Sequence, residues 1–235
     1  MQNLVPIGGL CNRLRVILSA AETNRNFRVC WAKNKDCGAW WEELFEPLAL
    51  PNVEMVHCPR TLMPSKWNLR LNRIWKRAIF TEYEIQPYDG VKAMKGIRPT
   101  KEIMDRVEQI SAAFDEHTIG LHVRRTDHHI SSAVTTDEAV IETLTTEIAQ
   151  NPKVKFYLTS DDEDFKKALK DKWPDHILTQ ECHGTRATLE GMKEAVIDLW
   201  TLARTTRILG SYWSSYSDTA SEIGDIPITI ITHKS

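Results

Sequence analysis

The sequence lacks the features that mark several large classes of protein. No window of 18 apolar residues occurs, and the N-terminus has no basic segment followed by an apolar one, so we expect neither a membrane span nor a secretion signal. The five cysteines are scattered and include no CxxC pair, which argues against a disulfide framework and a structural zinc site. We therefore expect a cytoplasmic protein in a reducing compartment.

The sequence also lacks an excess of positive or negative charge. The 30 Lys and Arg residues nearly balance the 32 Asp and Glu residues, giving a net charge of -2. No global field then attracts nucleic acid or an anionic membrane, so nucleic acid is not an expected partner and any anion site must be local. With 235 residues, 42% hydrophobic and 26% charged, the chain has the composition of one large or two small globular domains.

The periodicity of apolar residues predicts an α/β protein with parallel sheets. Pro and Gly residues cluster near residues 90–98, which predicts an N-terminal lobe of residues 1–97 and a C-terminal lobe of residues 98–235. Between residues 34 and 96 the pattern is too irregular to place elements. The expected strands are Leu4–Ile7, Phe27–Trp31, Thr118–Val123, Val154–Leu158, His176–Leu178, Arg207–Leu209 and Ile226–Ile231.

Ligands of open parallel sheets bind beyond the carboxyl ends of the strands, so the loops that follow strands are the first places to search. After Ile7 comes Gly8–Arg13 (GGLCNR), a glycine turn that leads into a helix. Its small residues allow backbone to approach a ligand. It lacks the GxGxxG and GK[ST] patterns of nucleotide loops, and a turn that only reverses the chain is the alternative.

Two adjacent arginines end the strand Thr118–Val123, within His122–His129 (HVRRTDHH). Guanidinium groups are costly to bury unless they meet carboxylate or phosphate. Strand alternation places Arg124 and Arg125 on opposite faces, so Arg124 can meet a ligand while Arg125 holds the loop, for example through Asp127. The histidine spacing does not fit metal ligation, and no metal site is expected.

Three further segments carry polar groups at helix starts or in an apolar setting. Thr159–Asp164 (TSDDED) would hold Mg²⁺ or Mn²⁺, or else form a capping box from Ser160 to Glu163. Asp198 lies in an apolar helix and requires a partner, either a guanine edge or an arginine such as Arg204. Gly210–Ser217 (GSYWSSYS) places hydroxyl and amide groups at a helix N-terminus. Together these features indicate a pocket for a diphosphate and a base.

Four of these motifs, in this order, resemble the α1,6-fucosyltransferase family, which includes the nodulation fucosyltransferases and has the α1,2- and protein O-fucosyltransferases as cousins. The motifs are the glycine turn Gly8–Arg13, His122–Asp127, Tyr157–Asp162, and Val196–Leu199 with Trp213–Ser217. The resemblance implies a GT-B-like fold of two Rossmann-like lobes with parallel sheets. The small N-terminal lobe would face the acceptor, and the C-terminal lobe would bind the nucleotide sugar.

The resemblance also implies the reaction: inverting, metal-independent transfer of L-fucose from GDP-fucose to a glycan or glycoside hydroxyl, without a cofactor. A transferase of the same fold that uses another donor, a UDP-pentose or a GDP-hexose, is one alternative. A GDP-sugar-binding or glycan-binding protein without catalysis is the other.

The same resemblance assigns roles to residues. Arg124 would hold the β-phosphate and neutralise the leaving GDP, Asp198 would read guanine, and Ser215, with Ser214 as a second candidate, would bind the diphosphate. His122 would contribute to the nucleotide pocket. The full set of expected donor-binding residues is Gly8, Gly9, Asn12, His122, Arg124, Asp162, Asp198, Ser214 and Ser215.

Two departures from the family pattern bear on mechanism. Long members place a catalytic Glu shortly after the Arg-Arg-Thr-Asp motif, whereas this chain reads His128–Ser132 (HHISS) there. Asp127, His128 and the adjacent His129 are then the local candidates for the general base, and we expect catalysis by Arg124 with Asp127 or His128. The segment Trp67–Arg77, rich in Trp and Arg, has no counterpart. It fits either an aromatic platform for a sugar acceptor or core packing with exposed Arg heads.

Overall fold

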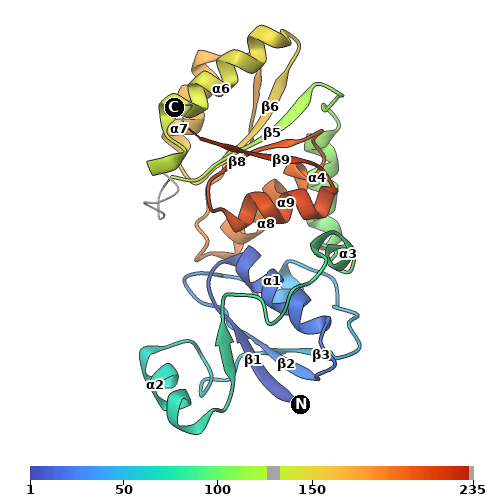
Figure 1. The fold of residues 1–235 in the computed structure, drawn as a ribbon, viewed down its shortest axis with the longest axis vertical. Coiled ribbons are helices and arrows are strands. Elements are labelled where there is room, and N and C mark those ends of the chain that lie inside the picture. Colours follow the sequence, from blue (N-terminus) through green and yellow to red (C-terminus); the bar gives the residue numbers. More distant parts are fainter. Residues whose placement is uncertain (126–132, 233–235) are drawn as a thin grey trace. The chain divides into compact units, whose positions relative to one another are not determined.

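The computed structural model of the chain describes residues 1–125 and 133–232, in which helices alternate with strands of two parallel sheets (Figure 1). The chain divides into two compact units, Met1–Met104 with His183–Val196, and Asp105–Cys182 with Ile197–Ser235. The sequence predicts a continuous first lobe of residues 1–97, whereas the first unit also includes a second stretch of the chain. The α/β class with parallel sheets is confirmed.

The first unit contains a four-stranded sheet in the order β3-β2-β1-β4, with every neighbouring pair parallel. Helix α1 packs beside β1 and β3 because its apolar residues Leu10, Leu14, Ile17 and Leu18 recur on one face and are buried. The elements are β1 (Gln2–Pro6), α1 (Leu10–Ala21), β2 (Phe27–Trp31), the 3₁₀ helix η1 (Trp41–Glu43), β3 (Val53–His57), α2 (Lys66–Trp75), β4 (Ile79–Thr81) and α3 (Gly90–Met94).

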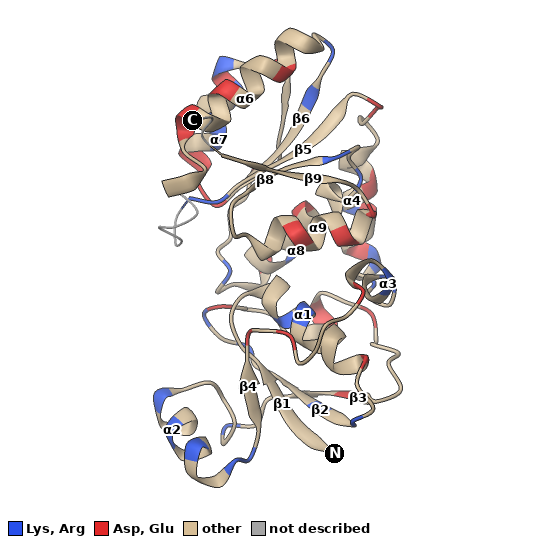
Figure 2. Ribbon diagram, viewed as in Figure 1, with Lys and Arg blue, Asp and Glu red and all other residues tan. Residues whose placement is uncertain are grey.

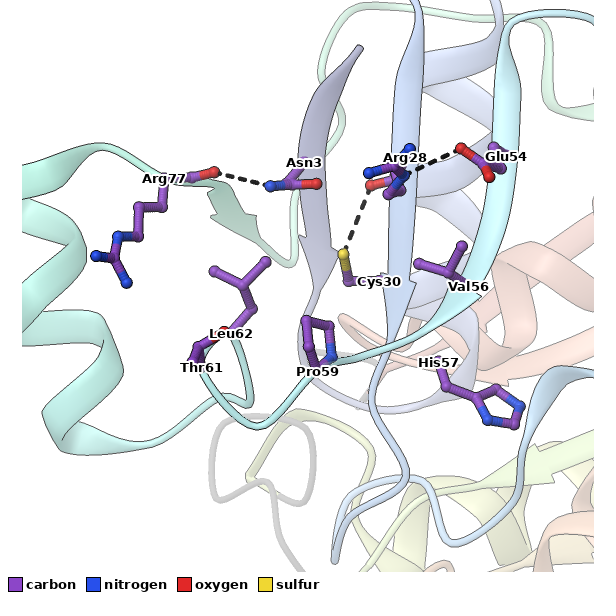
Figure 3. A pocket seen from close by; sticks show the side chains of 10 residues that line it. All are labelled: Asn3, Arg28, Cys30, Glu54, Val56, His57, Pro59, Thr61, Leu62 and Arg77. Atoms are coloured by element: carbon purple, nitrogen blue, oxygen red, sulfur yellow. Dashed lines mark hydrogen bonds and ion pairs between the residues drawn. The ribbon is translucent and has the colours of Figure 1, made fainter.

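An open pocket lies on the sheet of the first unit, next to the chain that flanks α2 (Figure 3). An ion pair joins Arg28 Nε and Glu54 Oε2 at 3.0 Å across β2 and β3, and Asn3 Nδ2 donates to the carbonyl oxygen of Arg77 at 3.2 Å. The residues that line the pocket include none of the expected donor-binding residues. This pocket is therefore separate from the expected donor-binding residues.

The second unit contains a five-stranded sheet in the order β7-β6-β5-β8-β9, again parallel throughout. Strand β5 is buried along its whole length, as its apolar sequence predicts. The elements are β5 (Thr118–Val123), α6 (Asp137–Gln150), β6 (Lys155–Ser160), α7 (Glu163–Lys172), β7 (Ile177–Leu178), β8 (Ile208–Ser211), α9 (Ser215–Gly224) and β9 (Ile228–Ile231). Helices α4 (Lys101–Ser111) and α8 (Leu189–Leu202) contain residues of both units.

The strand order of each sheet reverses direction at one point. The chain runs outward from β5 through β6 to β7, and on the other side from β8 to β9. Right-handed crossovers then place α6 and α7 on one face of this sheet and α9 on the other, as Figure 1 shows. The reversal lies between β5 and β8, and in the first sheet between β1 and β4. Crevices for ligands form at the carboxyl ends of strands at such reversals.

All five cysteines are free thiols, so no disulfide framework exists. Within residues 1–125 and 133–232, the structure has no helix that is long and apolar enough to cross a bilayer.

Candidate functional site

The carboxyl ends of β5 and β8 bring two predicted motifs together. Arg124 follows β5, and Tyr212–Ser214 joins β8 to the start of α9. The two strands are hydrogen-bonded neighbours at the reversal of strand order, so the predicted arginine and the predicted serine-rich helix start lie at one sheet edge. This edge is the strongest candidate for a ligand site in the second unit.

The backbone at Arg124 is fixed by the neighbouring strand. Arg124 N donates to Ser211 Oγ at 2.9 Å, and that hydroxyl donates to the carbonyl oxygen of His122 at 3.2 Å. Ser211 is fully buried in β8. One serine thus joins both sides of the reversal and sets the position from which the Arg124 side chain extends.

Arg125 has a structural role, as the alternation of the strand predicts. Its guanidinium forms an ion pair with Asp137 of α6, donates from Nη1 to the carbonyl oxygen of Thr135 at 3.0 Å, and lies 4.3 Å from the ring centroid of Phe165. Its backbone N–H donates to Asp161 Oδ1 at 2.7 Å. Arg125 therefore ties the end of β5 to α6, α7 and the loop after β6, while Arg124 begins on the other face.

His122 is an uncharged, buried ring at this edge. Its Nδ1 and Ser217 Oγ of α9 are joined by a hydrogen bond of 2.7 Å, and its ring packs against Tyr216 with centroids 4.8 Å apart. Burial lowers the pKa of His122 to about 4, although the Asp161 carboxylate acts in the opposite direction. The ring is therefore neutral at physiological pH, and positive charge at this edge must come from Arg124.

The N-terminus of α9 presents a hydroxyl group that the protein leaves without a partner. Ser214 occupies the N-cap position, yet its side chain makes no capping hydrogen bond, and its Oγ is buried without a partner among the described residues. Trp213, just before it, has a φ of 52°, in the left-handed region. Buried hydroxyl groups are nearly always hydrogen-bonded, and helix N-termini are places where proteins bind anions. Ser215 is the first residue of the helix and is half-buried.

The acidic loop after β6 is built differently from the predicted capping box. The N-cap of α7 is Asp162, whose carboxylate accepts from Phe165 N at 3.0 Å. Ser160 instead donates to the carbonyl oxygen of Val123 in β5 at 2.6 Å, so the expected box from Ser160 to Glu163 is wrong. The capping interpretation of the acids still holds for Asp162, which stabilises the α7 dipole as an N-cap.

Asp198 lies in a buried hydrogen-bond network. Its Oδ1 accepts from Tyr157 OH and from Gln180 Nε2, each at 2.6 Å, and Cys182 Sγ lies 3.7 Å from its Oδ2. The partner suggested from sequence, Arg204, is not among these. The two strong donors share one carboxylate oxygen, and within the described part of the chain the other oxygen contacts only a weak thiol donor.

The carboxyl group of Asp198 has a pKa closer to neutral pH than that of an ordinary aspartate. Burial raises the pKa of Asp198 to about 6, although the hydrogen bond from Tyr157 and the positive charge of Lys166 lower it. Lys166 is itself buried, and its Nζ donates to Gln180 O and Glu163 Oε1, each at 2.7 Å. The carboxylate is thus held close to a cation without touching it.

The glycine turn of the first unit has the form that the sequence predicts. Gly8 has a φ of 80°, which favours glycine, and Gly9 is the N-cap of α1, with open space where a Cβ would point. Asn12 lies in the first turn of α1 and is half-buried. Backbone at Gly9 is therefore accessible to a ligand.

Arg13 holds this turn from behind, a role that the sequence analysis missed. It is fully buried, and its guanidinium donates to Gly8 O at 2.9 Å, to Ala32 O, and to Asn34 Oδ1 at 3.0 Å. It also lies 5.2 Å from the ring centroid of Trp31. The sequence does indicate this burial, because Arg13 lies one turn after Leu10 and just before Leu14, on the apolar side of the helix.

The predicted general bases lie in a segment of the chain that the structure does not describe. The expected catalytic residues Asp127 and His128, with His129, lie outside the described residues. Among the described residues, no group of three or more His, Cys, Asp and Glu side chains is arranged to hold a metal ion.

Comparison with known proteins connects the fold to solved structures. No protein-family model matches the chain, and no curated protein sequence matches it. NodZ α1,6-fucosyltransferase soaked with GDP-fucose has 16% identity and a TM-score of 0.65, covering 94% of this chain and 92% of that one. NodZ from Bradyrhizobium has 17% identity and a TM-score of 0.62, covering 93% and 91%.

A second group of solved structures has the same architecture. POFUT1 in complex with GDP has 13% identity and a TM-score of 0.58, covering 98% of both chains. These similarities extend over nearly the whole chain and include both parallel sheets. The fold expected from the four sequence motifs is thereby confirmed: this protein has the two-lobed, GT-B-like fold seen in NodZ fucosyltransferase and POFUT1.

Proposed function

We propose that this protein is a glycosyltransferase that transfers L-fucose from GDP-fucose to a hydroxyl group of a glycan. The observation that carries the proposal is the edge of the second sheet where Arg124 lies beside the start of α9, with its buried, unpartnered Ser214 hydroxyl. A guanidinium and a helix N-terminus are both phosphate ligands. The complexes of NodZ with GDP-fucose and with GDP, in the same fold, support the choice of a guanosine diphosphate sugar.

In the proposed reaction the acceptor oxygen attacks C1 of fucose as the bond between C1 and the β-phosphate oxygen breaks. Attack from the face opposite the leaving group inverts the configuration at C1. Negative charge grows on the departing GDP, where Arg124 and the amides of the α9 N-terminus would stabilise it without a metal ion. His122 contributes hydrogen bonds but no charge, because its pKa of about 4 leaves it neutral.

The acceptor hydroxyl must lose its proton to a base in this scheme. Asp127 and His128 remain our proposed bases, since they follow Arg124 directly in the sequence. For the donor base, we propose that Asp198 Oδ2 accepts from the guanine edge while Oδ1 stays bound to Tyr157 and Gln180. For the first unit, we propose that the turn at Gly8 and Gly9, with Asn12, approaches the donor, and that this unit carries the acceptor.

Calorimetric titration with GDP and with UDP, each in EDTA, tests the donor site. We expect GDP to bind at micromolar concentration and UDP to give no response. Binding of UDP alone would remove the guanosine assignment in favour of a UDP-sugar transferase. GDP binding without hydrolysis or transfer of GDP-fucose across a panel of glycans would indicate a binding protein instead.

Arg124→Ala tests the catalytic role. Loss of a group that stabilises transition-state charge reduces turnover by about 10²–10³-fold. Arg106→Ala is the matched control, because Arg106 is an exposed arginine of the same unit whose Nη1 contacts only Gln109 among the hydrogen bonds found in the described residues. Near-normal turnover by Arg124→Ala, with the control also normal, would exclude Arg124 from the mechanism.

A further inference from the structure

Helix α2 buries none of its side chains. Trp67 is 74% exposed, Ile74 71% and Trp75 54%. Core packing, one of the two explanations the sequence allows for this segment, is therefore wrong for the helix. The buried cluster on this face of the sheet takes Leu62 and Met63 from before α2, and no residue from α2 itself. A cluster of large, solvent-exposed apolar side chains is typical of a surface that binds a protein, a ligand or a membrane.

Two asparagines hold α2 on the protein. Asn68 Nδ2 donates to the carbonyl oxygens of Arg60 and Met63, both at 2.9 Å. Asn72 Nδ2 donates to Ala78 O at 2.8 Å, and its Oδ1 accepts from Ala78 N at 3.0 Å. Because Asn68 and Asn72 are four residues apart, they lie on one side of the helix. That side faces the protein, and the remaining residues of the helix are exposed.

An exposed apolar stripe runs along α2, about a quarter turn around the helix from the two asparagines. Trp67, Leu71, Ile74 and Trp75 follow the spacing i, i+4, i+7 and i+8, which places them in one stripe about 100° wide. All four are exposed. We call this stripe the docking face of α2.

Cations are concentrated in α2 and in the chain next to it. Between Glu54 and Glu82 the chain has six Lys and Arg residues and no Asp or Glu, although its overall net charge is -2. In Figure 2 the ribbon of α2 is marked with blue and carries no red. The Arg77 guanidinium lies 4.3 Å from the ring centroid of Trp75. The six cations are Arg60, Lys66, Arg70, Arg73, Lys76 and Arg77.

We propose that α2 docks on an anionic lipid bilayer. The docking face enters the headgroup region and these cations contact lipid phosphates, an arrangement typical of helices that lie in a membrane surface. A second copy of the chain is a poor occupant, because six cations on each copy repel one another. Nucleic acid satisfies the cations but leaves the apolar stripe in water. Of these three occupants, the bilayer complements both the charge and the apolar face.

Co-sedimentation of the full chain with vesicles tests this proposal. We expect binding to phosphatidylcholine vesicles that contain about 30 mol % phosphatidylglycerol, little binding to pure phosphatidylcholine, and loss of binding as salt rises. Trp67→Ala with Ile74→Ala and, separately, Arg70→Glu with Arg73→Glu should each weaken vesicle binding at least about tenfold. Alanine and glutamate both favour helix, and these positions are exposed, so α2 should remain folded.

Matched controls lie elsewhere on the same unit. Tyr83→Ala removes an exposed aromatic ring, and Lys92→Glu with Lys95→Glu reverses two exposed charges near α3; both should bind vesicles like the parent. Absence of parent binding to anionic vesicles overturns the proposal. Binding that the charge reversal weakens but the alanine pair leaves unchanged also overturns it, since the surface would then recognise a polyanion without lipid insertion.

Discussion

Replacement of Asp198 by asparagine separates the stability of its network from its proposed contact with guanine. The asparagine Oδ1 can still accept from Tyr157 OH and Gln180 Nε2, the two bonds of 2.6 Å. The other oxygen becomes an NH₂ group, which donates and cannot accept from the guanine edge. One atom therefore changes at the position where the proposed ligand contact is made.

The effect on stability follows from the pKa of Asp198, about 6 in the folded protein against 3.8 for an aspartate in water. Because the folded state holds this proton more tightly, the stabilisation is complete below pH 3.8 and is lost as the pH rises through 6. The shift corresponds to about 3 kcal/mol. Asparagine has no such ionisation, so the variant should equal the parent near pH 4 and exceed its free energy of unfolding by about 3 kcal/mol above pH 7.

Urea denaturation across this pH range is the assay, and the difference between variant and parent is the quantity to compare. The parent curve alone is ambiguous because His122 acts in the opposite sense: burial lowers its pKa to about 4, so its contribution is present above pH 6.5 and is lost as the pH falls toward 4. That contribution is common to both proteins and cancels in the difference.

Calorimetry supplies the second half of the test. Loss of a carboxylate that hydrogen-bonds the guanine edge should weaken GDP binding at least about tenfold. Inosine diphosphate lacks the 2-amino group, so it should bind the parent protein more weakly than GDP does. A variant that is less stable than the parent at pH 8 would refute the electrostatic argument. A variant that keeps its GDP affinity would refute the contact with guanine.

Two further outcomes follow from single side chains. Ser214→Ala should leave the free energy of unfolding within about 0.5 kcal/mol, because the hydroxyl has no partner to lose, but weaken GDP binding about tenfold, as calorimetry would reveal; equal affinity would show that the hydroxyl does not meet the diphosphate. Arg13→Met should lower the free energy of unfolding by about 3 kcal/mol, since it strands the buried carbonyl groups of Gly8 and Ala32; a loss below about 1 kcal/mol in urea denaturation would contradict that role.

Much of the fold could be predicted where burial and periodicity agree. Strands Phe27–Trp31 and Thr118–Val123 have the predicted bounds because most of their residues are apolar and buried in a parallel sheet. Helix α2 could not be predicted, because asparagine side chains hold it in place and its apolar stripe faces water. Strand β4 has only three residues, all half-buried, which is too short for a period to show.

Some residues of the candidate site could also be predicted from the sequence, and others could not. Arg124 and the segment Gly210–Ser217 could be placed because each directly follows a predicted strand. The partners of Asp198 could not, because Tyr157 and Gln180 lie 41 and 18 residues away and no local pattern links them. The role of Ser160 could not be predicted for a similar reason: its hydroxyl donates to a carbonyl group of a neighbouring strand, which competes with the local capping box.

The guanidinium of Arg13 orders the glycine turn before any ligand binds there. Glycine-rich loops are ordinarily costly to order, because glycine loses more conformational freedom than any other residue. Here the carbonyl group of Gly8 is bound to a buried cation as soon as the unit folds. The entropy of that loop is therefore lost during folding, and a ligand that approaches Gly9 encounters backbone amides that already hold their positions.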